Sequence, residues 1–151
     1  AAAELCEDCL VVRTAWLYGH AGQNFVKTIM RLAEERPALD IVADQRGCPT
    51  YAEDLAHALK QLATSDLRGI CHVTNSGDCS WYEFAQAIAS QTAAKPVVRP
   101  ITTAQAGRPA KRPAYSVLSH DRFARQYSAL PDWQDALSRF MKRVSHPLSP
   151  A

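Results

Sequence analysis

The sequence contains neither a long apolar run nor a glycine-rich phosphate loop. A helix that spans a bilayer needs about 20 predominantly apolar residues, and every apolar stretch in this chain is much shorter. Only six glycines occur among 151 residues, and none of them forms the GxxGxxG or GxGxxG pattern that opens a dinucleotide-binding fold. We therefore expect no membrane association and no dinucleotide-binding loop within this chain.

The sequence also lacks a strong excess of charge. Its net charge is +2, with 47% hydrophobic and 21% charged residues, which is typical of a soluble globular domain. The basic residues gather in two short clusters, GRPAKRP and SRFMKRV. A nucleic-acid-binding domain has a broader basic face with aromatic residues in between. The composition therefore favours a small anionic ligand and no nucleic-acid partner.

The cysteines and histidines form no recognisable metal site. Five cysteines at irregular spacing argue against a secreted disulfide framework and predict a cytoplasmic protein. Cys6 and Cys9 have the C-x-x-C spacing of half a zinc site, but a structural zinc ion needs four ligands and no second pair follows. We interpret them as incidental thiols and predict no metal site; Mg²⁺ remains possible in the intact enzyme, although no motif here supports it.

Strand and helix patterns alternate along the chain. Short β-branched or extended runs predict strands within residues 10–17, 39–42, 69–74 and 95–102. Apolar spacing, cap signals and proline positions predict helices beginning at 24, 50, 80, 119 and 131. Two of the starts carry a capping box, with Thr50 followed by Glu53 and Ser80 followed by Glu83.

This alternation predicts an α/β fold with parallel strands. The strands are too few for a freestanding doubly wound sheet, and a buried opening strand needs neighbours on both sides. We therefore expect a partial domain whose front is missing. Its expected divisions are a truncated lead-in over 1–9, a folded part over 10–144 and a flexible tail over 145–151.

A family resemblance agrees with this interpretation. Taken together and in order, six blocks resemble the bacterial dTDP-4-dehydrorhamnose reductases of the extended short-chain dehydrogenase/reductase group: RTAWLYG, GQNFVKTIMRLAEE, DQRGCPTYAEDLA, SWYEFAQAI, PAKRPAYSVLS and LPDWQDAL. The match extends from about Leu10 to about Val144 and corresponds to the C-terminal half of such an enzyme. It implies the substrate-binding portion of a Rossmann-type NAD(P)-binding fold, without the N-terminal dinucleotide-binding half.

The resemblance also implies an activity for the intact enzyme. NADPH, or NADH, delivers hydride to the 4-keto carbon of dTDP-4-dehydro-L-rhamnose and yields dTDP-L-rhamnose. The N-terminal half supplies the glycine-rich loop and a catalytic Tyr-x-x-x-Lys pair. None of the five tyrosines here has a lysine four residues later. We therefore expect no catalytic residue in this chain, an inactive fragment, and the N-terminal half as its partner.

The resemblance assigns binding roles to three regions. Thr14 and Ala15 face the cofactor, and Trp16 packs against the deoxysugar ring, although a core role for this tryptophan is the simpler alternative. The helix start at Asn24, Phe25 and Lys27 holds the nucleotide, where free N–H groups favour an anion.

The diphosphate is assigned to the third region. Lys111 and Arg112, between Pro109 and Pro113, form a clamp for it. The family typically carries Arg-Arg here, and Arg108 is an additional basic residue. Gln45 and Arg46, in a loop that lines the nucleotide pocket in the wider group, are candidates for contact with the base or ribose.

Two alternatives remain. The chain could be a non-catalytic nucleotide-sugar-binding or regulatory protein on the same scaffold, like the regulatory subunit of methionine adenosyltransferase, or a remnant without activity. The sequence does not fix which 4-keto-6-deoxysugar nucleotide is the substrate, and a homodimer is compatible with it.

Overall fold

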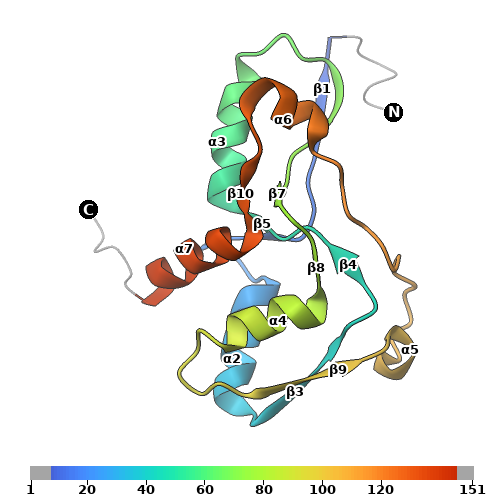
Figure 1. Cartoon of the computed structure of the whole chain (residues 1–151), viewed down its shortest axis with the longest axis vertical. Coiled ribbons are helices and arrows are strands. Elements are labelled where there is room, and N and C mark those ends of the chain that lie inside the picture. Colours follow the sequence, from blue (N-terminus) through green and yellow to red (C-terminus); the bar gives the residue numbers. More distant parts are fainter. Residues whose placement is uncertain (1–7, 146–151) are drawn as a thin grey trace.

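The computed structural model describes residues 8–145, in which short strands and helices alternate (Figure 1). The strands are β1 (Leu10–Arg13), β2 (Leu17–Tyr18), β3 (Ala38–Val42), β4 (Arg46–Gly47), β5 (Thr50–Tyr51), β6 (Gly69–His72), β7 (Asn75–Ser76), β8 (Cys79–Ser80), β9 (Val97–Ile101) and β10 (Leu130–Asp132). The helices are α2 (Phe25–Glu35), α3 (Ala52–Ala63), α4 (Trp81–Ala89), α5 (Thr103–Ala106), α6 (Asp121–Tyr127) and α7 (Trp133–Ser145). The predicted lead-in up to residue 7, which includes Cys6, and the tail from residue 146 lie outside the described residues.

The strands pair mostly in parallel, as the alternation of elements predicts. β1 pairs with β6, β2 with β5, β3 with β9 and β10 with β7, all parallel, and only β4 with β8 is antiparallel. Within residues 8–145 these pairs remain separate two-stranded pieces and do not merge into one sheet. The α/β class is confirmed. No helix in this part of the chain is long and apolar enough to span a membrane.

The predicted opening strand is shorter than expected. β1 ends at Arg13, and Trp16 adopts a left-handed backbone conformation with φ of 45°. A non-glycine residue is rarely found there, because its Cβ crowds the backbone. The turn redirects the chain into β2, which pairs with β5 and not with β6. The apolar pattern of residues 10–17 does not reveal this break.

One of the two predicted capping boxes is wrong. Thr50 belongs to β5 and is fully buried, and its hydroxyl donates to the carbonyl of Cys48; α3 begins at Ala52 without a side-chain cap. The second box is confirmed, because Ser80 Oγ accepts from the Glu83 amide at 3.1 Å and the Glu83 carboxylate accepts from the Ser80 amide at 2.6 Å. A third box was missed: Thr102 and Gln105 cap α5.

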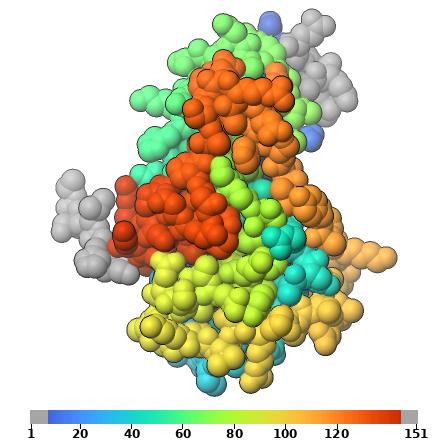
Figure 2. Space-filling view, viewed as in Figure 1, coloured from blue at the N-terminus to red at the C-terminus, as the bar shows by residue number. Residues whose placement is uncertain are grey.

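Two apolar clusters form the core. The first cluster surrounds Tyr18, Phe84 and Phe140 and joins α2, α4, α7 and β3. The second surrounds Val73 and Phe123 and includes residues of α3 and α6. In Figures 1 and 2, α7 lies in the middle of the molecule, between the end that holds α2, α4, β3 and β9 and the end that holds β1, β6, α3 and α6. The C-terminal helix therefore links the two ends.

A partly buried ion pair fixes α7 to α3. Arg139 donates two parallel hydrogen bonds to the Asp54 carboxylate, at 2.8 and 2.7 Å, and a third to Asp135 at 2.8 Å. Asn75 donates to Asp54 at 2.7 Å and accepts from the Tyr51 amide at 2.8 Å. Asp54 is 6% exposed, and every polar atom of such a buried group needs a partner. The network therefore joins α3, α7, β5 and β7.

The β1–β6 pair has two different edges. The Arg122 guanidinium donates to the carbonyls of Arg68 and Ile70, both at 2.6 Å, and so covers the outer edge of β6. Among residues 8–145, β1 has no strand on its other side. The side chain of Ile70, which belongs to β6, is 40% exposed. Further strands therefore have access to the sheet only on the β1 side.

We expect Arg139→Ala to destabilise the protein by about 2–3 kcal/mol, because the buried Asp54 carboxylate loses its cationic partner. The free energy of unfolding in urea measures the loss. Arg31→Ala is the matched control, because its ion pair with Glu35 is exposed within one helix and is worth only about 0.3–0.5 kcal/mol. Equal losses for the two variants would contradict the structural role of the Asp54 pair.

Acid should weaken the same network. Burial alone would raise the pKa of Asp54, but hydrogen bonds from Arg139 and Asn75 hold this pKa below its usual value. Such a carboxyl contributes stability above its unfolded pKa of about 3.9, and that stability is lost as pH falls through the lower folded value. We expect unfolding free energy measured from pH 7 to pH 3 to decline less steeply in Arg139→Ala than in the wild type; parallel curves would contradict this.

Candidate functional site

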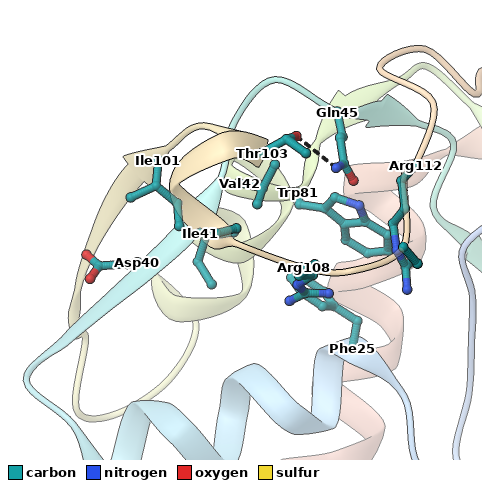
Figure 3. Close-up of a pocket in the computed structure, with 12 residues that line it drawn as sticks. Phe25, Asp40, Ile41, Val42, Gln45, Trp81, Ile101, Thr103, Arg108 and Arg112 are labelled. Atoms are coloured by element: carbon teal, nitrogen blue, oxygen red, sulfur yellow. Dashed lines mark hydrogen bonds between the residues drawn. The ribbon is translucent and has the colours of Figure 1, made fainter.

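A cavity of about 320 Å³ lies at the carboxyl ends of β3 and β9 (Figure 3). This is the edge at which α/β sheets usually bind ligands. The start of α2, the start of α4, α5 and the loop after α5 complete the walls. The lining residues are Phe25, Asp40, Ile41, Val42, Gln45, Trp81, Ile101, Thr103, Ala106, Arg108, Ala110 and Arg112.

One wall of the cavity is aromatic. Trp81, the first residue of α4, lies 4.5 Å from Phe25 between ring centroids. The Trp16 indole stacks on the Trp81 indole, with ring centroids 3.5 Å apart and ring planes inclined by 9°. Trp16 itself does not line the cavity. The Trp81 indole therefore forms part of the cavity wall and is supported by the Trp16 indole behind it.

The stack requires the glycine at position 47. A Cβ built on Gly47 would lie 2.3 Å from Cε2 and 2.5 Å from Nε1 of Trp16. Such approaches are far inside van der Waals contact, and the indole fills this space only because glycine has no side chain. The Trp16 carbonyl also accepts from the Thr50 amide at 3.2 Å. The left-handed turn, Gly47 and β5 thus fix the indole together.

A polar group faces the cavity next to this wall. Gln45 is 6% exposed and donates from Nε2 to Thr103 Oγ1 at 2.9 Å (Figure 3). The Thr103 hydroxyl donates to the Asp44 carboxylate at 2.7 Å, and the Thr103 amide donates to the same carboxylate. These bonds lower the pKa of Asp44 from its ordinary value, so Asp44 is an anion that accepts hydrogen bonds only.

Two guanidinium groups make the open side of the cavity basic. Arg108 and Arg112 both line it and are exposed, and neither has an ion pair or hydrogen bond to another residue within 8–145. Lys111 lies between them in sequence but is not among the lining residues. Of the predicted Lys111–Arg112 clamp, only Arg112 lines the cavity, together with Arg108, and the diphosphate role of the clamp stays a prediction.

The structure brings only part of the predicted helix start to the cavity. Phe25 lines it. Asn24 caps α2 by accepting from the Lys27 amide at 3.1 Å and donates to the Gly19 carbonyl at 2.8 Å. The Lys27 ammonium donates to the carbonyls of His20 and Gly22 at 2.5 and 3.0 Å. Both polar side chains therefore hold the loop before α2, and their ligand roles stay predictions.

The other predicted residues also lie outside the cavity. Thr14 and Ala15 link β1 to β2, and Thr14 is exposed. Arg46 turns away to Asp78 at 2.8 Å and Glu83 at 3.0 Å, so it braces β4 against the start of α4. Within residues 8–145 no three acidic, histidine or cysteine residues are grouped to hold a metal ion.

Sequence reasoning missed Trp81 and Thr103 as lining residues. Trp81 directly follows the Ser80 cap and Thr103 directly follows the Thr102 cap. Residues at the first position of a helix lie close to whatever occupies the space before it. The two capping boxes are therefore the sequence signal that could have identified both.

Comparison with known proteins gives a consistent result. Residues 1–146 match the family described as the RmlD substrate binding domain. The spore coat polysaccharide biosynthesis protein SpsK of Bacillus subtilis is 44% identical over 139 residues, which cover 92% of this chain and 49% of the relative. A dTDP-4-dehydrorhamnose reductase of Sinorhizobium fredii is 39% identical over 87% of this chain and 48% of its own.

A solved structure agrees with these relatives. The dTDP-4-dehydrorhamnose reductase of Bacillus anthracis, in complex with NADP, has a TM-score of 0.84 and 43% identity over 89% of this chain and 48% of that one. The chain spans about half the length of the relatives that it matches.

We expect Gly47→Ala to break the indole stack, because the added Cβ occupies the space of the Trp16 ring. Overpacking of this kind costs about 1–3 kcal/mol. Near-ultraviolet circular dichroism should lose the signal of the coupled indoles. Gly22→Ala is the control: it adds a Cβ at a positive φ of 66° with nothing within 4 Å, so it strains the backbone but should keep that signal. An unchanged spectrum for Gly47→Ala would contradict the packing.

Proposed function

The chain belongs to the family of RmlD substrate-binding domains, and on that premise we propose that its cavity binds the nucleoside diphosphate of a dTDP-sugar. The resemblance inferred from the six sequence blocks to the dTDP-4-dehydrorhamnose reductases is thereby confirmed. One observation carries the proposal: two guanidinium groups without a partner among residues 8–145, those of Arg108 and Arg112, lie beside an aromatic wall in one cavity. Arginine binds phosphate oxygens through two parallel hydrogen bonds, and an indole offers a broad face to a planar ring or a sugar.

The reaction proposed for the intact enzyme is the reduction of dTDP-4-dehydro-L-rhamnose to dTDP-L-rhamnose with NADPH. Support comes from relatives named dTDP-4-dehydrorhamnose reductase and from the relative in complex with NADP. Hydride transfer is the chemistry that the nicotinamide supplies when bound. This chain would contribute substrate binding, with Thr14 and Ala15 at the carboxyl end of β1 on the cofactor side. They carry no glycine-rich phosphate cradle, so the cofactor would be held largely by another segment.

The free edge of β1 is where such a segment would attach. Arg122 covers the β6 edge, whereas β1 has no second neighbour within residues 8–145. A dinucleotide-binding half that adds a parallel strand beside β1 would pair its exposed backbone groups. Catalytic inactivity of the chain alone, a homodimer and a cytoplasmic location stay predictions; the last rests on the odd cysteine count.

Calorimetric titration of the purified chain with dTDP, and separately with NADPH, tests the proposal. We expect dTDP to bind and NADPH to bind much more weakly or not at all. Arg112→Ala and Arg108→Ala should each weaken dTDP binding by about tenfold or more, because a charge-assisted hydrogen bond is worth about 1.5–3 kcal/mol.

Lys111→Ala is the matched control for these variants. It removes a neighbouring cation that is not among the lining residues, so its effect on dTDP affinity should be at most about twofold and should fade with added salt. A loss of dTDP affinity as large as that of Arg112→Ala would indicate that Lys111 contacts the phosphates, as the resemblance implies. Absence of dTDP binding to the wild-type chain would overturn the proposed function.

A further inference from the structure

The outer edge of β6 carries two carbonyl groups that face away from β1. The amides of Gly69 and Val73 donate to carbonyls on the β1 side, at 2.8 and 2.9 Å. Backbone groups of successive residues in a strand point to opposite sides. The odd-numbered residues from 69 to 73 therefore face β1, whereas Arg68 and Ile70 direct their carbonyls outward. A strand added at this edge would bond to these two carbonyls.

Arg122 occupies both carbonyls. Its Nη1 donates to the Ile70 carbonyl and its Nη2 to the Arg68 carbonyl, both at 2.6 Å. The next residue in α6, Phe123, is 1% exposed and belongs to the same apolar cluster as Cys71 of β6. This packing fixes α6 beside the strand and so positions the guanidinium. Its two donors lie where two amides of an added strand would lie.

The sequence of β6 offers no protection of its own. Exposed edge strands are usually blocked by lysine, by other charged side chains or by proline. The strand β9, which also has a partner on one side only within residues 8–145, carries Arg99 and Pro100. The strand β6 consists of Gly-Ile-Cys-His and contains no arginine, lysine or proline. Arg122, from another element, thus supplies the block that β6 lacks.

The free edge of β1 is complementary to the outer edge of β6. Within one copy the two strands already pair in parallel over four residues. The odd-numbered residues of β1 bond to the β6 side, as the Arg13 carbonyl does, so Leu10 and Val12 direct their amides to the open side. These amides are two residues apart, as are the carbonyls of Arg68 and Ile70. The β1 strand of a second copy therefore matches the edge that Arg122 covers.

Pairing of β6 with the β1 strand of a second copy would not produce a closed assembly. Such a head-to-tail contact uses a different edge on each copy, so every added copy leaves another edge free and an open chain grows. Pairing of two β1 edges, in contrast, uses the same edge twice and stops at a dimer. An uncovered β6 edge would therefore permit open-ended assembly.

We propose that Arg122 blocks the β6 edge against the β1 strand of a second copy of this chain. By covering this edge, Arg122 restricts strand addition to β1, the edge that stays open for another segment. The inference goes beyond nucleotide binding, because it concerns how the sheet assembles and is independent of what the cavity holds.

The molar mass of the full chain, measured by light scattering over a range of protein concentrations, tests this proposal. We expect the wild-type mass to remain at or below that of a dimer. Arg122→Ala uncovers two carbonyls, so its mass should exceed that of a dimer and continue to rise with concentration. An Arg122→Ala mass that follows the wild-type curve would overturn the blocking role, as would open-ended growth of the wild type.

Two further variants separate the block from effects of charge and folding. Arg125→Ala removes the same charge from the same helix, but Arg125 is exposed and has no hydrogen bond or ion pair to another residue within 8–145. This variant should follow the wild type, and growth equal to that of Arg122→Ala would overturn the proposal. Arg122→Met keeps the apolar stem and removes every donor. It should assemble like Arg122→Ala even if the alanine variant folds poorly, and a wild-type mass curve would contradict the block.

Ile70→Pro separates strand addition from general aggregation. The Ile70 amide points outward, so a proline at this position removes no bond to β1 but prevents the amide from pairing with an added strand. Combined with Arg122→Ala, it should return the mass to the wild-type curve, while far-ultraviolet circular dichroism confirms that the double variant is folded. Continued growth of the double variant would show that added copies do not pair with β6, and this result would overturn the proposal.

Discussion

The fold depends most on the ion pair between Asp54 and Arg139. The carboxylate is almost completely buried, and a buried charge is tolerated only when its partners compensate for the lost hydration. Arg139 from α7 and Asn75 from β7 supply them. Asn75 then accepts from the Tyr51 amide, and Tyr51 lies in β5. A single buried carboxylate thus fixes the relative positions of α3, α7, β5 and β7.

The cavity wall is connected to this network through the backbone. β5 pairs with β2, and the residue directly before β2 is Trp16, whose carbonyl accepts from Thr50. The position of the Trp16 indole, and hence the backing of Trp81, therefore follows from strands that the Asp54 network anchors. Gly47 provides the remaining space for the ring. The aromatic part of the cavity wall is consequently held in place by packing and strand pairing, although much of the wall belongs to loops and helix starts.

Much of the architecture could be predicted from the sequence, and the failures have physical causes. Helix α2 and the Ser80 cap follow from local patterns, because apolar spacing and capping chemistry act within a few residues. The turn at Trp16 could not be predicted, because a bulky residue enters the left-handed region only when distant contacts compensate for the strain. Thr50 matched a capping box, but strand pairing with Leu17 overrode this local preference.

The same distinction, between what local patterns determine and what distant contacts determine, applies to the candidate site. Phe25 and Arg112 reach the cavity as the resemblance implies, whereas Lys111 does not. No local sequence pattern indicates which of the three nearby cations, Arg108, Lys111 and Arg112, line the cavity. Trp16 stacks on Trp81, and its expected role against the sugar stays a prediction. The cavity wall therefore includes some of the residues that the resemblance singles out and not others, because the packing of side chains decides which residues form it.

Recognition and reduction make different demands on this chain. Four residues at the cavity, Asp44, Thr103, Gln45 and Trp81, all lie within the described residues and are joined to one another by hydrogen bonds. Hydride transfer, in contrast, requires a dinucleotide site that has no glycine-rich loop here. Because the cavity is formed by residues of this chain, ligand binding to it can be measured separately from the reaction proposed for the intact enzyme.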